Sequence, residues 1–226
     1  MLIGHYGPAL LLQRTRPTLP LWALFVAVQA VDVLWGVFIL TGVEHVRIIP
    51  GFTESNGLDL YDMPYTHSLV ATLAWSTLAA VAWASFRRSP TRWAEGLTIG
   101  VAVASHFAGD LLVHVPDLPV MSSAGAKWGL GLWRHRELAL VVELAFFVLP
   151  AIWWRRGYWQ PEGSRRRDTL LQLMTLVLVA SFYVPTPPAP WAMALTGLAT
   201  YLVAARAAAW AAPDPMPAPR ELDAAS

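Results

Sequence analysis

The chain has 226 residues, of which 56% are hydrophobic and only 14% are charged, and its net charge is +1. A soluble domain carries about 25% charged residues, so this composition indicates an integral membrane protein, and its continuous apolar runs favour helices over a β-barrel. The arginines form short clusters rather than a basic face, which excludes the pattern of a nucleic-acid-binding protein, and the absence of cysteine excludes thiolate metal ligands and disulfides.

The apolar runs predict an all-α, polytopic transmembrane bundle of about six spans. Residues 1–13 are apolar but too short to cross a bilayer, so they are predicted to form a re-entrant or partly inserted helix. Each later run approaches the length of a membrane-spanning helix. The predicted spans are residues 19–42, 66–86, 97–115, 137–154, 169–184 and 191–210. We expect one transmembrane domain over residues 1–212 and a disordered, Pro/Ala-rich tail over 213–226.

The third run contains the most informative side chains. His106, Asp110 and His114 recur at intervals of four residues and therefore share one helix face. An ionisable side chain inside a membrane helix is costly and by default marks a functional site. The simpler interpretation of His106 and Asp110 is a hydrogen-bonded pair that locks two helices together.

Further polar side chains occur on other segments, namely His5, Asp32 in the middle of the first span, and His67 at the start of the second. Counting helical rise from the cytoplasmic ends places His5, Asp32 and His106 near the membrane midplane. The same count places His67 and His114 about 10 Å away, near the outer surface. His67 could therefore be an interfacial residue after an N-capping Thr66, and His114 is expected at the interface rather than in a metal site.

Histidine and carboxylate ligands without thiolates suit Zn²⁺, Mn²⁺ or Fe²⁺. The hypothesis from these residues is a divalent metal, with zinc favoured, held by His67, His106, Asp110 and Asp32, with His5 as a further ligand.

The order of these motifs resembles one family. Gly4-His5, Asp32, Thr66-His67-Ser68 and Ser105-His106 followed by Asp110 occur as they do in the membrane-bound metal-dependent hydrolases, also called LexA-binding inner-membrane-associated hydrolases. The resemblance covers about residues 3–145. It implies a bacterial cytoplasmic (inner) membrane protein, a hydrolase site formed by Asp32, His67, His106, Asp110 and a later glutamate, and Glu143 as that glutamate.

The chain departs from the family pattern at two places. The family has Pro-Asp-x-Asp where this chain has Ala30-Val31-Asp32-Val33-Leu34, so one carboxylate is missing. The family has His-Arg-Gly before Thr-His-Ser where this chain has Asp62-Met63-Pro64-Tyr65. Asp62 or His114 could replace the lost ligands, or a two-metal site could have been reduced to one metal or none.

The favoured function is hydrolysis of an ester or phosphoester in a lipid or lipid-linked substrate, with membrane lipids as the expected partners and no nucleic acid. Three alternatives stay open. Asp32, His106 and Asp110 could form a proton relay in a transporter. Histidine pairs could ligate the haem of a b-type cytochrome, or the chain could be a non-catalytic relative. Glu143 could equally support the site or pair with Arg134 or Arg136.

Overall fold

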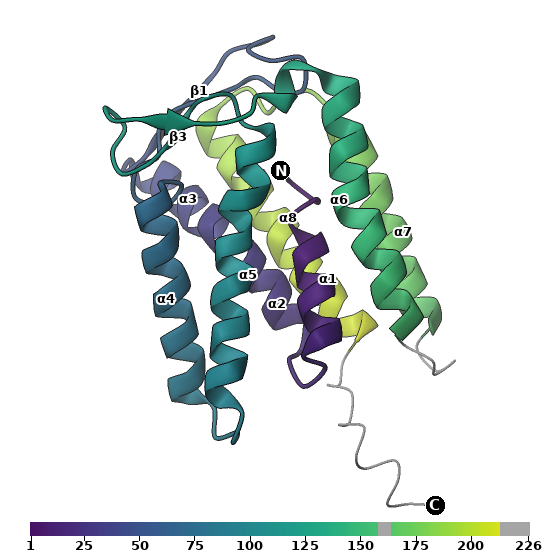
Figure 1. Cartoon of the computed structure of the whole chain (residues 1–226). Coiled ribbons are helices and arrows are strands. Elements are labelled where there is room, and N and C mark those ends of the chain that lie inside the picture. Colours follow the sequence, from purple (N-terminus) through teal and green to yellow (C-terminus); the bar gives the residue numbers. More distant parts are fainter. Residues whose placement is uncertain (158–163, 213–226) are drawn as a thin grey trace, which may run out of the picture.

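The computed structural model describes residues 1–157 and 164–212 and consists mainly of helices, as Figure 1 shows. The all-α prediction is confirmed, whereas the predicted tail at 213–226 lies outside the described residues. The helices are α1 (Tyr6–Thr15), α2 (Leu21–Val28), α3 (Ala30–Thr41), α4 (Leu69–Phe86), α5 (Arg92–Val113), α6 (Arg136–Gly157), α7 (Ser164–Ser181) and α8 (Pro190–Ala211).

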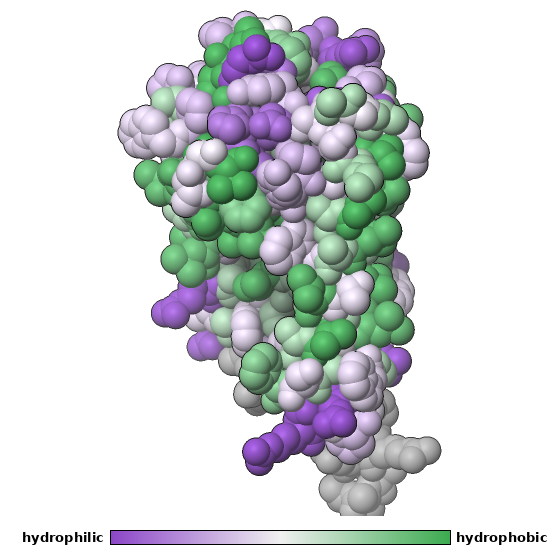
Figure 2. Space-filling view, turned by 90° about the vertical axis from the view of Figure 1, so that its left-hand side faces the viewer, coloured by the Kyte–Doolittle hydropathy of each residue, from purple (hydrophilic) through white to green (hydrophobic). Residues whose placement is uncertain are grey.

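Four of these helices, α4, α5, α6 and α8, are long and apolar enough to cross a membrane. The α2–α3 pair would make a fifth span, although it is bent by 52°. The predicted count of six is not confirmed, because α7 has only 18 residues and four of its first five are charged, namely Arg165, Arg166, Arg167 and Asp168. Figure 2 shows a broad band of hydrophobic residues between hydrophilic ends on one face of the molecule, as expected for a bundle surrounded by lipid.

The first predicted span is broken in its middle. Residues 19–42 form α2 and α3, which are separated at Gln29. The Gln29 side chain is buried, and its Nε2 donates a hydrogen bond to the carbonyl of Leu2 at 2.8 Å. A break at membrane depth is tolerated where other protein groups satisfy the freed backbone, and this one is enclosed by the bundle.

The short helix α1 lies inside the bundle, where it packs against α6, α2 and α5 (Figure 1). The prediction of a short N-terminal helix is therefore confirmed. Close packing against α6 depends on Gly7, because a Cβ atom at this position would overlap the carbonyl oxygen of Phe146. On the same side of the bundle, Trp154 of α6 is fully buried, and its indole Nε1 donates to the side chain of Gln13 at 2.5 Å.

Two small antiparallel hairpins cover one end of the bundle (Figure 1), opposite the turn that joins α4 and α5. The first pairs β1 (His45–Ile48) with β2 (Leu58–Asp62), and the second pairs β3 (Leu118–Pro119) with β4 (Lys127–Trp128). Asp62 joins the two, since Ser123 Oγ donates to its Oδ1 at 2.6 Å and His45 Nδ1 lies 2.9 Å from its Oδ2. The hydrogen bond from Ser123, with that from His45, lowers the pKa of Asp62.

Gly7→Ala is expected to destabilise the packing of α1 against α6 by about 1–3 kcal/mol, because the added methyl group forces the two helices apart. Thermal unfolding in detergent measures the effect. Gly197→Ala is the matched control, since its added Cβ would lie 3.5 Å from Tyr201, an ordinary contact. Equal melting temperatures for the two variants would contradict this description of the packing.

The two hairpins β1–β2 and β3–β4 together form a cap on the bundle, called the hairpin cap below. This hairpin cap is expected to loosen in acid. Because the pKa of Asp62 in the folded protein lies below the ordinary 3.8, the ionised carboxylate stabilises the cap above that pH. This stabilisation is lost as the pH falls through the lower, folded-state pKa. Hydrogen exchange of the β1–β2 amides against pH measures it. Ser123→Ala should shift the loss to higher pH, and an unchanged profile would show that the bond does not hold the cap.

Candidate metal centre

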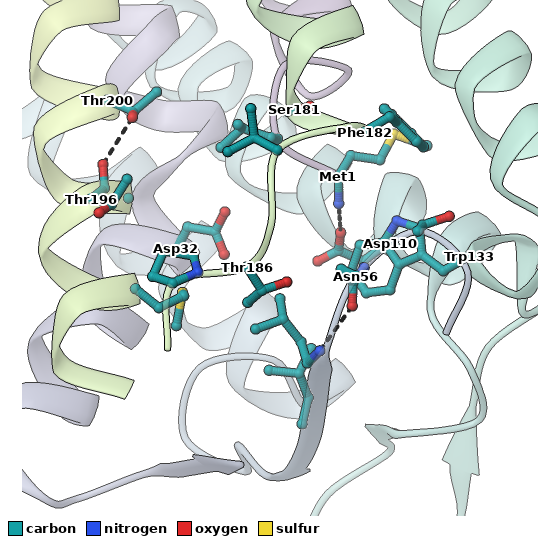
Figure 3. A pocket seen from close by; sticks show the side chains of 18 of the residues that line it. Met1, Asp32, Asn56, Asp110, Trp133, Ser181, Phe182, Thr186, Thr196 and Thr200 are labelled. Carbon is teal, nitrogen blue, oxygen red and sulfur yellow. Dashed lines mark hydrogen bonds and ion pairs between the residues drawn. The ribbon is translucent and has the colours of Figure 1, made fainter. Parts of the chain in front are cut away.

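Histidine and aspartate side chains from separate segments meet in the interior, below the hairpin cap. Asp32 belongs to α3, and His106 and Asp110 belong to α5. His5 comes just before α1, and His67 lies in the loop before α4. His114 follows the end of α5. All four histidines and Asp110 are at most 4% exposed, so the cluster is shielded from solvent. Figure 3 shows Asp32 and Asp110 in the cavity that borders this cluster.

Asp110 is the centre of the cluster. Its Oδ2 lies 3.1 Å from Nε2 of His106 and 3.7 Å from Nε2 of His67. Its Oδ1 lies 3.0 Å from Nε2 of His5 and 3.5 Å from Nε2 of His114. Four imidazoles therefore face one carboxylate through the same ring atom.

Asp32 bounds the same space from α3. Its Oδ1 lies 3.2 Å from Nε2 of His67 and 3.5 Å from Nε2 of His106. Its Oδ2 accepts a hydrogen bond from the hydroxyl group of Tyr201 in α8 at 2.8 Å. The Tyr201 bond holds one oxygen of Asp32 in place and leaves the other directed at the two imidazoles.

The second ring nitrogen of His67 is held by two residues. The hydroxyl group of Thr66 donates to Oε2 of Glu44 at 2.6 Å, so its oxygen is left to accept from Nδ1 of His67 at 2.8 Å. The backbone N–H groups of Tyr65 and Thr66 donate to the other oxygen of Glu44. Burial raises the pKa of Glu44 above its ordinary value. These contacts place the proton of a neutral His67 on Nδ1 and leave a lone pair on Nε2.

Two further imidazoles are oriented in the same way. Val28 is the last residue of α2, so its carbonyl has no partner within that helix, and it accepts from Nδ1 of His106 at 2.8 Å. Nδ1 of His114 lies 2.8 Å from a carboxylate oxygen of Asp117. The break in the first span thus supplies the acceptor that orients the central histidine.

These contacts aim three Nε2 lone pairs at carboxylate oxygens, an arrangement that requires a cation or additional protons between them. Nε2 of His106 makes the need clearest. It lies 3.1 Å from Asp110, yet it is buried without a hydrogen bond of acceptable geometry. Metal-bound histidines characteristically donate their other ring N–H to a carbonyl, carboxylate or similar acceptor. His106, His67 and His114 all have such an acceptor.

Two triads have the spacing of a metal site. Ligand atoms of His5, Asp32 and His106 lie within 4.8 Å of one another, as do those of His67, His106 and Asp110. His106 belongs to both triads, so a single ion between them would have imidazole and carboxylate ligands from four segments. Such nitrogen and oxygen ligands suit Zn²⁺ and similar first-row metals.

His5 is packed against the centre by its ring. It stacks on His106 with the ring centroids 3.8 Å apart, and its Nδ1 is buried without a hydrogen-bond partner. Gly109 makes this approach feasible, because a Cβ atom there would lie 3.0 Å from the His5 ring. The amino group of Met1 lies 2.7 Å from Oδ1 of Asp110 and occupies the neighbouring side of that carboxylate.

Glu143 lies in the wall of the adjoining cavity and is 3% exposed. It forms none of the ion pairs of the cluster, and neither Arg134 nor Arg136 lies within ion-pair distance of it. Arg136 instead donates to the carbonyl and carboxylate of Glu54 in the β1–β2 connection. Glu143 therefore lies beside the centre as a carboxylate of the cavity wall, where the Trp133 side chain and the Leu2 backbone donate hydrogen bonds to it.

The structure brings together every histidine and aspartate of the predicted ligand set, but not in the predicted two tiers. The count of helical rise assumed one continuous span through Asp32, whereas that span is broken at Gln29. His114, expected at the interface, is buried beside Asp110. Asp62 does not replace a ligand, because it is bound in the hairpin cap.

Sequence reasoning missed the residues that orient the site. Glu44, Asp117 and Tyr201 are not among the site residues predicted from the sequence. The adjacent pair Thr66-His67 was the only local signal, and the partners of both residues come from distant parts of the chain.

Comparison with protein-family models finds no match for this chain, and neither the curated proteins nor the solved structures give one. The candidate site therefore stands on its own geometry.

Glu44→Gln is expected to lower the affinity for zinc by about ten- to a hundredfold, because an amide can accept at only one of the two positions where the carboxylate accepts. Competition with a chelator on purified protein measures the affinity. Glu137→Gln, at an exposed position in the first turn of α6, is the matched control. Equal affinities for the two variants would show that Glu44 does not orient His67 for metal binding.

Proposed function

We propose that the protein is an integral membrane hydrolase that depends on a divalent metal, with zinc as the ion. His67, His106, Asp110 and Asp32 hold the metal, His5 completes the set from the N-terminal side, and His114 adjoins it. The observation that carries the proposal is the fixed orientation of three imidazoles. Each is anchored through Nδ1, and each directs Nε2 at the carboxylates of Asp32 or Asp110.

The cost of burying these groups supports a function beyond packing. A pair of carboxylates inside a membrane bundle is expensive, and a structural role would need only one hydrogen-bonded pair between helices. Here at least five helix or loop segments contribute to a single cluster. A buried cluster of ionisable groups from so many segments is typical of a catalytic or transport site.

A bound divalent metal would supply Lewis-acid chemistry and lower the pKa of a water molecule. The residues of the chain do the rest. Asp32, held by Tyr201, and Asp110 neutralise the charge of the ion. Glu143, in the wall of the cavity, is placed to accept a proton from the attacking water and to return it to the leaving group. The buried position of the cluster limits access of bulk water.

The same proposal includes the finer assignments made from the sequence. These are a six-span topology in which α7 completes the bundle, a location in the bacterial cytoplasmic membrane, and kinship with the membrane-bound metal-dependent hydrolases. The retained motifs Gly4-His5, Thr66-His67 and Ser105-His106 support the kinship. The substrate would be an ester or phosphoester of a lipid or lipid-linked molecule.

One observation favours a second candidate, a proton-coupled transporter. Broken helices at membrane depth commonly form the substrate sites of transporters, and α2 and α3 are broken beside Asp32. Proton-dependent uptake into vesicles by metal-free protein would support it. For the haem alternative, His5 and His106 are not a usable ligand pair, because their imidazoles stack with centroids 3.8 Å apart and leave no space for a porphyrin between them.

Protein purified in detergent is expected to contain about one equivalent of zinc per chain, and elemental analysis measures it. His106→Ala and His67→Ala should each remove most of the metal, since each deletes a central nitrogen ligand. His135→Ala, at an exposed position outside the cluster, should retain it. Metal content that is unchanged in the two central variants would contradict the proposed centre.

A further inference from the structure

We propose that the site acts on an uncharged carboxylic ester of a lipid and not on a phosphoester. This inference rests on the proposed function and names the substrate class for the same site. It follows from the size, lining and charge of the cavity beside the metal centre, shown in Figure 3.

The cavity has a polar end and an apolar wall. His67, His114, Asp32 and Asp110 bound it at the metal centre. Apolar side chains from α3, the β1–β2 hairpin, the α7–α8 connection and α8 form much of the remaining wall, namely Trp35, Leu58, Leu60, Phe182, Val184 and Met193. This division fits an amphiphile whose reactive group faces the centre and whose chain lies along the wall.

The volume of the cavity sets how much of a substrate fits inside. It is about 300 Å³, which corresponds to roughly ten groups the size of a water molecule. This space holds the reacting group and a short stretch of chain. A longer acyl chain must therefore leave through the mouth of the cavity.

The mouth lies where the α7–α8 connection meets α8. Val184 and Thr196 line the cavity and are exposed, Val184 to 64%. Tyr183 and Trp191, which are 57% and 63% exposed, flank this opening along the chain. Exposed aromatic residues of this kind concentrate at membrane–water interfaces. The remaining chain of a substrate would thus extend from the mouth into the lipid.

Charge decides between the two kinds of ester. The lining includes three carboxylates, Asp32, Asp110 and Glu143, but no lysine or arginine. The amino group of Met1, which also lines the cavity, is already bound to Asp110. One divalent cation and the Met1 ammonium group together balance these three carboxylates, so a phosphate group would bring further negative charge without a cationic partner. Phosphate sites ordinarily provide arginine, lysine or helix N-termini for this purpose.

An ester carbonyl avoids this cost because it is neutral in the ground state. Hydrolysis breaks the bond between the acyl carbon and the alcohol oxygen and joins that carbon to the water oxygen. One water proton passes through Glu143 to the departing alkoxide. The products are a carboxylic acid and an alcohol, and no other reactant is needed.

Photo-crosslinking in detergent with two probes tests the substrate class. Both carry the same diazirine-labelled acyl chain, and one ends in an uncharged glycerol ester whereas the other ends in a phosphate monoester. Mass spectrometry of peptides from residues 193–201 measures the labelling of the cavity. We expect the uncharged probe to label these residues about tenfold more than the phosphate probe, because the phosphate charge lacks a partner.

Four variants show whether the labelling reports the cavity and its charge. Gly197→Leu, which places a bulky side chain in the lining, should abolish most labelling, and Ala199→Leu on the exposed side of the same helix should not. Gly197→Ala adds a methyl group that fits at ordinary contact distance. Labelling retained in this variant would show that Gly197→Leu acts by filling the cavity and not by misfolding. Thr196→Lys adds a cation at the mouth and should narrow the preference for the uncharged probe.

The outcomes separate the inference from the proposed function. Equal labelling by the two probes, or a preference for the phosphate probe, would overturn the inference even if zinc is bound. Absence of zinc from the same samples would refute the proposed function, whereas the labelling ratio is measured separately from the metal content and decides the charge preference of the cavity. A tenfold preference that Gly197→Leu removes would support the uncharged ester.

Discussion

Two buried carboxylates, Asp32 and Asp110, impose the constraint on which the structure depends. A negative charge inside a membrane bundle is tolerable only where positive charge or a metal ion compensates it. Four imidazoles surround these oxygens at 3.0–3.7 Å, and they are supplied by segments far apart in the chain. The fold can be understood as the arrangement that brings His5, His67 and α5 to the same point.

Irregular backbone contributes to this arrangement as much as the regular helices do. The break between α2 and α3 frees the carbonyl of Val28, which orients His106. The loop before α4 brings Thr66 onto Glu44 and so fixes His67. In a membrane such backbone is tolerated only where it is enclosed by protein, and both segments are enclosed. The break in the first span is thereby part of the site.

The sequence was sufficient for the helical class, the short N-terminal helix and the membership of the cluster, because apolar length and buried charge are local signals. It was not sufficient for the break at Gln29, where the sequence has neither proline nor glycine. The predicted span began at residue 169, whereas α7 begins at Ser164 and therefore includes four charged residues that a membrane-spanning helix would exclude. Glu44, Asp117 and Tyr201 act through tertiary contacts, and a single sequence does not contain those pairings.

The central claim is that one metal ion unites these imidazoles and carboxylates. X-ray absorption at the zinc edge on purified protein tests it most directly. The account predicts a first shell of nitrogen and oxygen ligands at about 2.0–2.2 Å, with the scattering signature of at least two imidazoles. A spectrum of hydrated or detergent-bound zinc without imidazole scattering would contradict it and would show that protons alone hold the cluster together.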